Sequence, residues 1–160
     1  MPMGDAYAQT YYHLIWATKG RQEMIGPEVQ PDLYSCLRGK CDALGVAVHA
    51  VGGMADHVHL VCSIPPQLAV ARCVEQIKEA SSHYMSHSGP GVVFRWQAGY
   101  GVLTFSKSQL PRVVEYVVHQ KEHHTRGALS AAMESAPAAP DAPVDIATPR
   151  DDEPSRDADP

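Results

Sequence analysis

Strand-like and helix-like hydrophobic patterns follow one another along this 160-residue chain in an order that few folds accommodate. Alternating or β-branched apolar runs predict strands, and apolar residues three or four apart predict helices. The expected elements are a strand over 7–18, a helix over 27–45, strands over 46–51 and 54–63, a helix over 67–84 and a strand over 102–105. This β-α-β-β-α-β order is typical of an α+β, ferredoxin-like fold. Its antiparallel sheet carries helices on one face and leaves the other face free.

The remaining sequence predicts an added helix and then a tail. The helix is expected from near Ser108 to about Arg126, with Pro111 acceptable in its first turn. Beyond Glu134, Pro, Ala and Asp dominate, and so little apolar surface cannot offset the entropy of ordering the chain. We therefore expect one folded domain over 7–128 and a disordered acidic tail over 129–160, which is either inert and solvated or an interaction segment.

The net charge of −5 comes from the tail rather than from the domain. Residues 136–160 hold seven Asp or Glu side chains against two arginines, whereas the preceding residues hold eleven basic and eleven acidic ones. A neutral domain neither supports nor excludes a nucleic-acid partner, because binding depends on where cations cluster.

The composition also bears on location and on redox state. The sequence has no run of eighteen apolar residues and no signal-like N-terminal pattern, so we expect a soluble, cytoplasmic protein without membrane contact. Its four cysteines form neither a CxxC pair nor a zinc-like spacing, and they are expected to be reduced and buried in apolar segments: Cys36, Cys41, Cys62 and Cys73.

Two histidines share one face of the third expected strand. Successive side chains on a strand point to opposite faces, so His57 and His59 lie side by side while Val58 and Leu60 occupy the other face. Neutral imidazole is the commonest metal ligand, and a sheet holds it rigidly. Such a pair also occurs among exposed strand histidines of no consequence, so another segment must supply the rest of a site.

The last expected helix carries a phenol and an amide four residues apart. Residues at this spacing lie one above the other on a helix, which places Tyr116 one turn from Gln120. Beside a histidine pair, this arrangement suggests a nucleophile next to a metal ligand. Considered alone, however, Tyr116 is equally well explained as a packing residue and Gln120 as an exposed helix former.

Five motifs in a fixed order narrow these alternatives. The motifs are Tyr12–Lys19, Gly53–Leu60, Lys78–Ser82, Trp96–Gly101 and Tyr116–His124. Together they resemble the single-tyrosine HUH transposases, in particular the REP-associated tyrosine transposase branch, over roughly residues 9–128.

The resemblance implies a DNA transposase that cleaves and rejoins single-stranded DNA, expected to contain a hairpin. It implies Tyr116 as the catalytic nucleophile, which forms a 5′-phosphotyrosine, and His57, His59 and Gln120 as ligands of Mg²⁺ or Mn²⁺. A phenol with a pKa near 10 is a weak nucleophile at neutral pH, so a cation that stabilises the phosphate is chemically required. Related transposases include homodimers, in which the tyrosine helix completes the partner's site, and monomers.

DNA contacts are expected from aromatic and basic side chains near the motifs. Trp96 and Tyr100 could stack on unpaired bases or could pack in the core. The candidate cations for backbone phosphates or bases are Lys19, Arg21, Lys78, Arg95, Lys107 and Arg112.

Two other functions remain open at this point. One is a domesticated, non-cleaving binder of structured single-stranded DNA. The other is a zinc hydrolase that uses His57 and His59 with His123 or His124, for which Asp56 is the nearest acidic residue.

Overall fold

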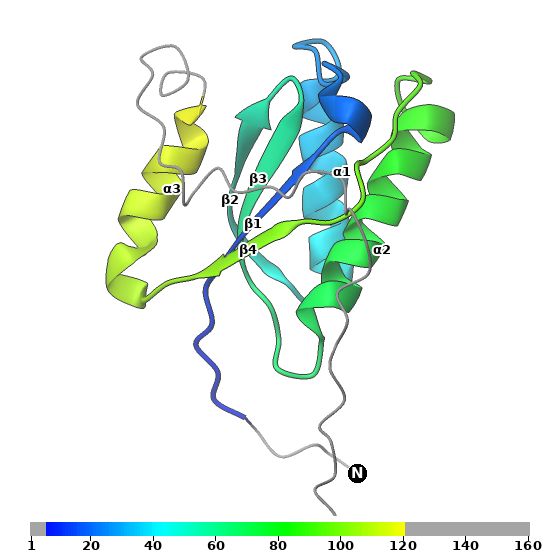
Figure 1. The fold of residues 1–160 in the computed structure, drawn as a ribbon. Coiled ribbons are helices and arrows are strands. Elements are labelled where there is room, and N and C mark those ends of the chain that lie inside the picture. Colours follow the sequence, from blue (N-terminus) through cyan, green and yellow to red (C-terminus); the bar gives the residue numbers. More distant parts are fainter. Residues whose placement is uncertain (1–5, 121–160) are drawn as a thin grey trace, which may run out of the picture.

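The computed structural model describes residues 6–120, and its element order confirms the expected ferredoxin-like arrangement with an added helix (Figure 1). The strands are β1 (Tyr12–Ala17), β2 (Ala47–Met54), β3 (His57–Ser63) and β4 (Gly101–Thr104), and the helices are α1 (Gln30–Ala43), α2 (Val70–His83) and α3 (Leu110–Val118). Short helical turns cover Lys19–Arg21, Tyr84–Ser88 and Lys107–Gln109. The end of the domain at residue 128 and the expected tail lie outside the described residues.

The four strands form one antiparallel sheet in the order β2-β3-β1-β4. Helices α1 and α2 cover one face, and α3 lies against the other (Figure 1). The main core lies beneath α1 and α2, where Leu14, Trp16 and Leu60 of the sheet meet Leu33 and Ile77 of the helices. All five side chains are buried, and each such burial stabilises the fold by about 1.5–3 kcal/mol.

A smaller apolar cluster attaches α3 to the opposite face. Val113, Tyr116 and Val117 of α3 pack on Ala50 of β2 and Val61 of β3. These three helix residues recur at i, i+3 and i+4, which is the spacing that places side chains on one face of a helix. The face that we expected to be free is therefore partly covered by the added helix.

Several boundaries differ from the sequence-based expectation. Strand β1 begins at Tyr12 rather than near residue 7, because Tyr12 pairs with Cys62 and Thr104 and the chain before it has no neighbouring strand. Helix α1 begins at Gln30, so Pro31 rather than Pro27 occupies its first turn. Gly45 ends this helix as expected, with φ +73°.

The connection between β2 and β3 was expected at Gly52-Gly53, and this prediction was wrong. Both glycines lie within β2, where Gly52 pairs with His59 and Gly53 with Val58, and the turn is made by Ala55 and Asp56. Gly53 has φ +151°, a conformation that L side chains rarely adopt, and a Cβ on Gly52 would collide with the carbonyl oxygen of Val117. Gly52 therefore allows α3 to approach the sheet closely, whereas a Cβ on Gly53 would collide with the backbone of His57 in β3.

Helix α3 ends inside the expected span, and residues 121–126 of that span lie outside the described residues. It ends at Val118, and His119 departs from helical geometry with φ −98° and ψ 27°. Tyr116 and Gln120 therefore do not lie on one uninterrupted helix. Four valines among the nine residues of α3 weaken its final turn, because β-branched side chains lose rotamer freedom in a helix.

Candidate active site

The two histidines of β3 lie beneath α3 rather than on the face that packs against α1 and α2. Val58 and Leu60 alternate with them and enter the main core, as the strand pattern predicted. The imidazole rings of His57 and His59 have centroids 5.1 Å apart, and both side chains are buried. The sheet therefore holds two neighbouring imidazoles at fixed positions in a site largely shielded from water.

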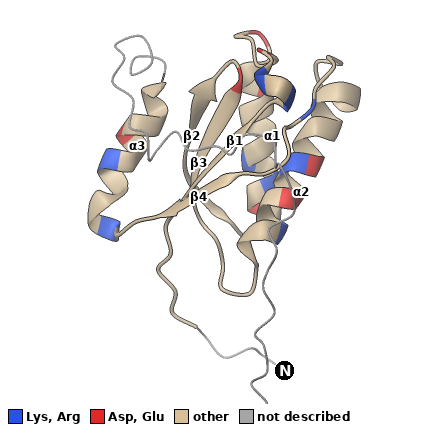
Figure 2. Cartoon of the chain, viewed as in Figure 1, with Lys and Arg blue, Asp and Glu red and all other residues tan. Residues whose placement is uncertain are grey.

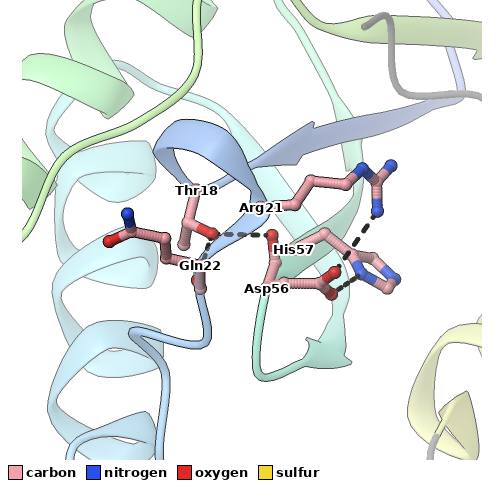
Figure 3. A network of polar contacts seen from close by, with 5 residues as sticks. All are labelled: Thr18, Arg21, Gln22, Asp56 and His57. Carbon is pink, nitrogen blue, oxygen red and sulfur yellow. Dashed lines mark hydrogen bonds and ion pairs between the residues drawn. The ribbon is translucent and has the colours of Figure 1, made fainter.

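Asp56 holds the first of these imidazoles. Its carboxylate oxygen Oδ1 lies 2.6 Å from Nδ1 of His57, and Oδ2 lies 3.4 Å from Nη1 of Arg21 (Figure 3). The Asp56 carbonyl accepts a hydrogen bond from the Thr18 hydroxyl. These contacts connect the turn after β1 with the turn before β3, directly beside His57. Sequence analysis gave Asp56 no part in holding His57, although its position directly before the His pair was a signal.

His13 contacts the second imidazole from the neighbouring strand. Its Nε2 atom lies 2.7 Å from Nδ1 of His59. The register pairs His13 with Val61, so His59 is its diagonal neighbour on the same face of the sheet. Sequence analysis included His13 in a motif but gave it no role, because the register that brings it to His59 cannot be derived from the spacing within one strand.

Tyr116 lies over this pair of histidines. Its ring packs edge-on against that of His59 with centroids 6.2 Å apart, and its side chain is 7% exposed. Gln120 is buried after the end of α3, where it lines a pocket of about 200 Å³ together with Gly52 and Gly53 of β2. Because Gly52 is directly opposite His59, the structure brings Gln120 to the same part of the sheet despite the interruption at His119.

The donor set fits a hard divalent cation. The Nδ1 atoms of His57 and His59 face Asp56 and His13, so Nε2 is the nitrogen with which each ring would coordinate a metal. An amide oxygen from Gln120 would add an oxygen ligand of the kind that Mg²⁺ accepts. Within residues 6–120, no three His, Cys, Asp or Glu side chains form a metal-binding group, and His123 and His124 of the zinc alternative lie outside the described residues.

Two side chains expected to contact DNA have structural contacts in this fold. Trp96 packs edge-on against Trp16 and Phe94, and its Nε1 donates to Ser81 Oγ at 2.9 Å. Lys78 donates from Nζ to the carbonyl oxygens of Gln97 and Gly99, and burial lowers its pKa below the ordinary value. These contacts are those of packing and bracing groups, and the expected roles in DNA binding stay predictions.

The other expected DNA contacts differ in exposure. Lys19 and Arg95 are exposed, and the backbone N–H of Lys19 donates to the Arg95 carbonyl oxygen, so the two residues are neighbours. Arg21 is exposed but forms the ion pair with Asp56. Tyr100 is half-buried against the main core. Lys and Arg are absent from all four strands and lie on the helices and connecting segments (Figure 2).

The four cysteines are free thiols, as expected, and burial raises their pKa values. The pKa of Cys41 rises to about 12 and that of Cys73 to about 11. Thiols in this state are weak nucleophiles and weak metal ligands at neutral pH. The chemistry of the site is therefore carried by imidazole, phenol, amide and carboxylate groups.

Comparison with known proteins gives one consistent result. The model of a family described as "Transposase IS200 like" matches residues 6–120. The ISDra2 transposase TnpA of Deinococcus radiodurans is 32% identical over 129 residues, which cover 76% of this chain and 92% of that protein. The transposase for insertion sequence element IS200 of Salmonella typhimurium is 28% identical over 122 residues, covering 72% and 80% of the two chains.

Solved structures agree with the fold. A crystal structure of a candidate transposase from Deinococcus radiodurans has a TM-score of 0.59 at 31% identity, covering 75% of this chain and 98% of that chain. A REP-associated tyrosine transposase bound to a REP hairpin has a TM-score of 0.57 at 12% identity, covering 78% and 74%. None of the helices within residues 6–120 has the length and apolar character needed to cross a bilayer.

Proposed function

Because this chain belongs to the IS200-like family of single-tyrosine HUH transposases, we propose that it cleaves and rejoins single-stranded DNA through Tyr116, with Mg²⁺ or Mn²⁺ held by His57, His59 and Gln120. The family establishes the coarser statement that the chain is a DNA transposase. The observation that supports the finer proposal is the contact of the Tyr116 ring with His59 on the face that carries both imidazoles.

The reaction follows from the nature of these groups. The Tyr116 oxygen attacks a backbone phosphorus, the bond from phosphorus to the 3′-oxygen breaks, and that oxygen takes up a proton to become a 3′-hydroxyl. The product is a 5′-phosphotyrosine, in which one phosphodiester has replaced another. Attack by a different 3′-hydroxyl reverses the step and joins strands without a nucleotide cofactor. A bound divalent cation would act as a Lewis acid on the phosphate.

The protein's own residues contribute position and shielding. A buried site strengthens electrostatic interactions, and fixed ligands require no reorganisation during the reaction. Tyr116 is almost entirely covered, which shields the phenol from water. A positioned phenol then has a short path to the phosphate, which is the advantage of holding nucleophile and cation on adjacent elements.

The test is the formation of a covalent protein–DNA adduct that survives denaturation. Because one structural relative is bound to a REP hairpin, a single-stranded oligonucleotide with a hairpin is the first substrate to use. We expect an adduct with Mg²⁺ or Mn²⁺, none after chelation, and none with Tyr116→Phe. The proposal fails if the adduct persists in the phenylalanine variant. Tight hairpin binding without any adduct would instead favour the non-cleaving DNA binder.

A further inference from the structure

The two imidazoles proposed to bind the cation are held by different kinds of group. Nδ1 of His57 faces the carboxylate of Asp56, an acceptor that requires this nitrogen to carry a proton. Nδ1 of His59 faces Nε2 of His13, and an imidazole nitrogen can either donate or accept. The tautomer of His59 is therefore coupled to that of His13, a residue on another strand.

Metal coordination decides which arrangement is productive. A His59 ring that coordinates through Nε2 needs a lone pair there, so its proton must be on Nδ1. The 2.7 Å contact is then a hydrogen bond from His59 Nδ1–H to His13 Nε2, and His13 carries its own proton on Nδ1. The opposite arrangement, with His13 as donor, places the His59 proton on Nε2 and blocks coordination.

The fold fixes this contact on both sides. His13 and His59 are diagonal neighbours on adjacent strands, and both side chains are buried. Their rings are 5.0 Å apart at the centroids and tilted by 31°. Leu14 and Leu60, which follow His13 and His59 along their strands, point into the main core and anchor the two strands in register.

We propose that His13 is a positioning residue that accepts the Nδ1–H of His59 and so holds the Nε2 atom of His59 ready to bind the divalent cation. This inference rests on the proposed function, because it concerns the same metal site. It assigns a role to a residue outside the proposed ligand set and outside the third strand.

Metal affinity is the first test. Mn²⁺ binding is measured on the full chain by electron paramagnetic resonance, without DNA. We expect His13→Leu to weaken binding by about tenfold to a hundredfold, the range typical of groups that support a ligand histidine. His13→Gln should restore most of the affinity, because its amide oxygen can accept the same proton. His49→Leu is the matched control, since His49 is a strand histidine bonded to Ser63 and should leave Mn²⁺ affinity unchanged.

A spectroscopic test separates this role from a purely structural one. Long-range ¹H–¹⁵N spectra distinguish the two imidazole tautomers, and we expect His59 of the wild type to carry its proton on Nδ1 even before metal is added. His13→Gln should keep this tautomer and His13→Leu should lose it. If the leucine variant does not fold, the wild-type tautomer and the glutamine variant still decide the question.

The outcomes keep the two proposals distinct. If wild-type protein does not bind Mn²⁺, or if His57→Ala binds it equally well, the proposed metal site is wrong. If wild-type protein binds Mn²⁺ and the folded His13→Leu variant binds it equally tightly, the metal site stands and the role of His13 is refuted. A His59 proton on Nε2 in the metal-bound wild type would also refute it.

Discussion

The ammonium group of Lys78 lies between two backbone carbonyl oxygens, 2.6 Å from that of Gln97 and 3.0 Å from that of Gly99. Gln97 in turn accepts a hydrogen bond at its Oε1 from the backbone N–H of Gly20 and donates its own N–H to the Ala17 carbonyl. Lys78 therefore braces the segment that holds the turn after β1, and this turn carries Arg21, the ion-pair partner of Asp56.

Lys78→Met should consequently lower stability more than it weakens DNA binding. The variant keeps the aliphatic stem but removes a charged donor from two carbonyl oxygens, and we expect a loss of about 1–3 kcal/mol in the free energy of unfolding. Urea denaturation measures this loss. Lys107→Met is the matched control, because Lys107 is exposed and its replacement should change stability by no more than about 0.5 kcal/mol.

The effect of Lys78→Met on DNA binding is measured by titrating binding with salt. If Lys78 contacted a phosphate, as its sequence position suggested, Lys78→Met would remove about one phosphate contact. The decrease of log K for DNA binding with log salt concentration would then become less steep by the amount expected for one contact. We expect no such change in slope. A reduced slope together with unchanged stability would show that the bracing role is wrong and that the lysine binds DNA directly.

At single residues, the sequence predicted which groups share a face but not what holds them. Alternation along β3 was enough to separate His57 and His59 from Val58 and Leu60. The contacts of Asp56 with Arg21 and of His13 with His59 depend on cross-strand register and on a turn geometry that no spacing within one segment encodes. The same reason explains why the structural contacts of Trp96 and Lys78 could not be derived from the sequence.

At the scale of elements, the position of α3 depends on Gly52. A Cβ atom there would overlap the carbonyl oxygen of Val117, which is backbone and cannot move aside as a flexible side chain could. Val117 is fully buried against the sheet and directly follows Tyr116, so any displacement of this turn moves the nucleophile relative to His59.

Gly52→Ala should therefore reduce adduct formation by about tenfold or more while the sheet and the main core stay folded. The expected size follows from the sensitivity of positioned reactions, where a displacement of about 1 Å can lower the rate by about a hundredfold. Circular dichroism and adduct yield measure the two properties separately. An adduct yield equal to that of the wild type would show that α3 does not need the glycine.

Gly39→Ala is the matched control for this substitution. Gly39 is an exposed position inside α1, and a Cβ there has no atom within 4 Å. Alanine favours the helix over glycine by roughly 0.5–1 kcal/mol, so this variant should be slightly more stable than the wild type and form the adduct normally.

The order of elements was predictable because periodicity changes between strand and helix segments, and each change is visible in the sequence. The first and last residues of each strand and helix were less predictable, because they depend on the segments that pack against that element. Gly52-Gly53 looked like a turn, yet Gly52 serves a close contact with Val117 of α3, more than sixty residues further along the chain. The interruption at His119 likewise has no Gly or Pro that would have marked it in the sequence.

At the scale of the whole molecule, charge is divided unevenly along the chain. The strands carry no Lys, Arg, Asp or Glu, so any electrostatic attraction of a polyanion comes from the helices and connecting segments (Figure 2). Residues 1–135 hold equal numbers of basic and acidic side chains, and residues 136–160 add the net charge of −5. Approach of DNA is therefore governed by a neutral domain and an anionic segment attached to it.

Deleting residues 136–160 should accelerate association with single-stranded DNA at low salt. Removal of five net negative charges lowers repulsion of the polyanion, and we expect the association rate to rise by roughly threefold to tenfold at about 10 mM salt. The Debye length falls from about 30 Å at 10 mM to about 10 Å at 100 mM, so the difference should largely disappear at the higher concentration. Stopped-flow fluorescence with a labelled oligonucleotide measures both rates.

A tail of unchanged length in which the seven acidic residues and the two arginines are replaced by Asn or Gln separates charge from bulk. If electrostatic repulsion is the cause, this chain should associate as fast as the deletion variant and show the same weak dependence on salt. If it instead associates as slowly as the wild type, the segment acts by occupying space, and the rate difference should persist at high salt because excluded volume is not screened.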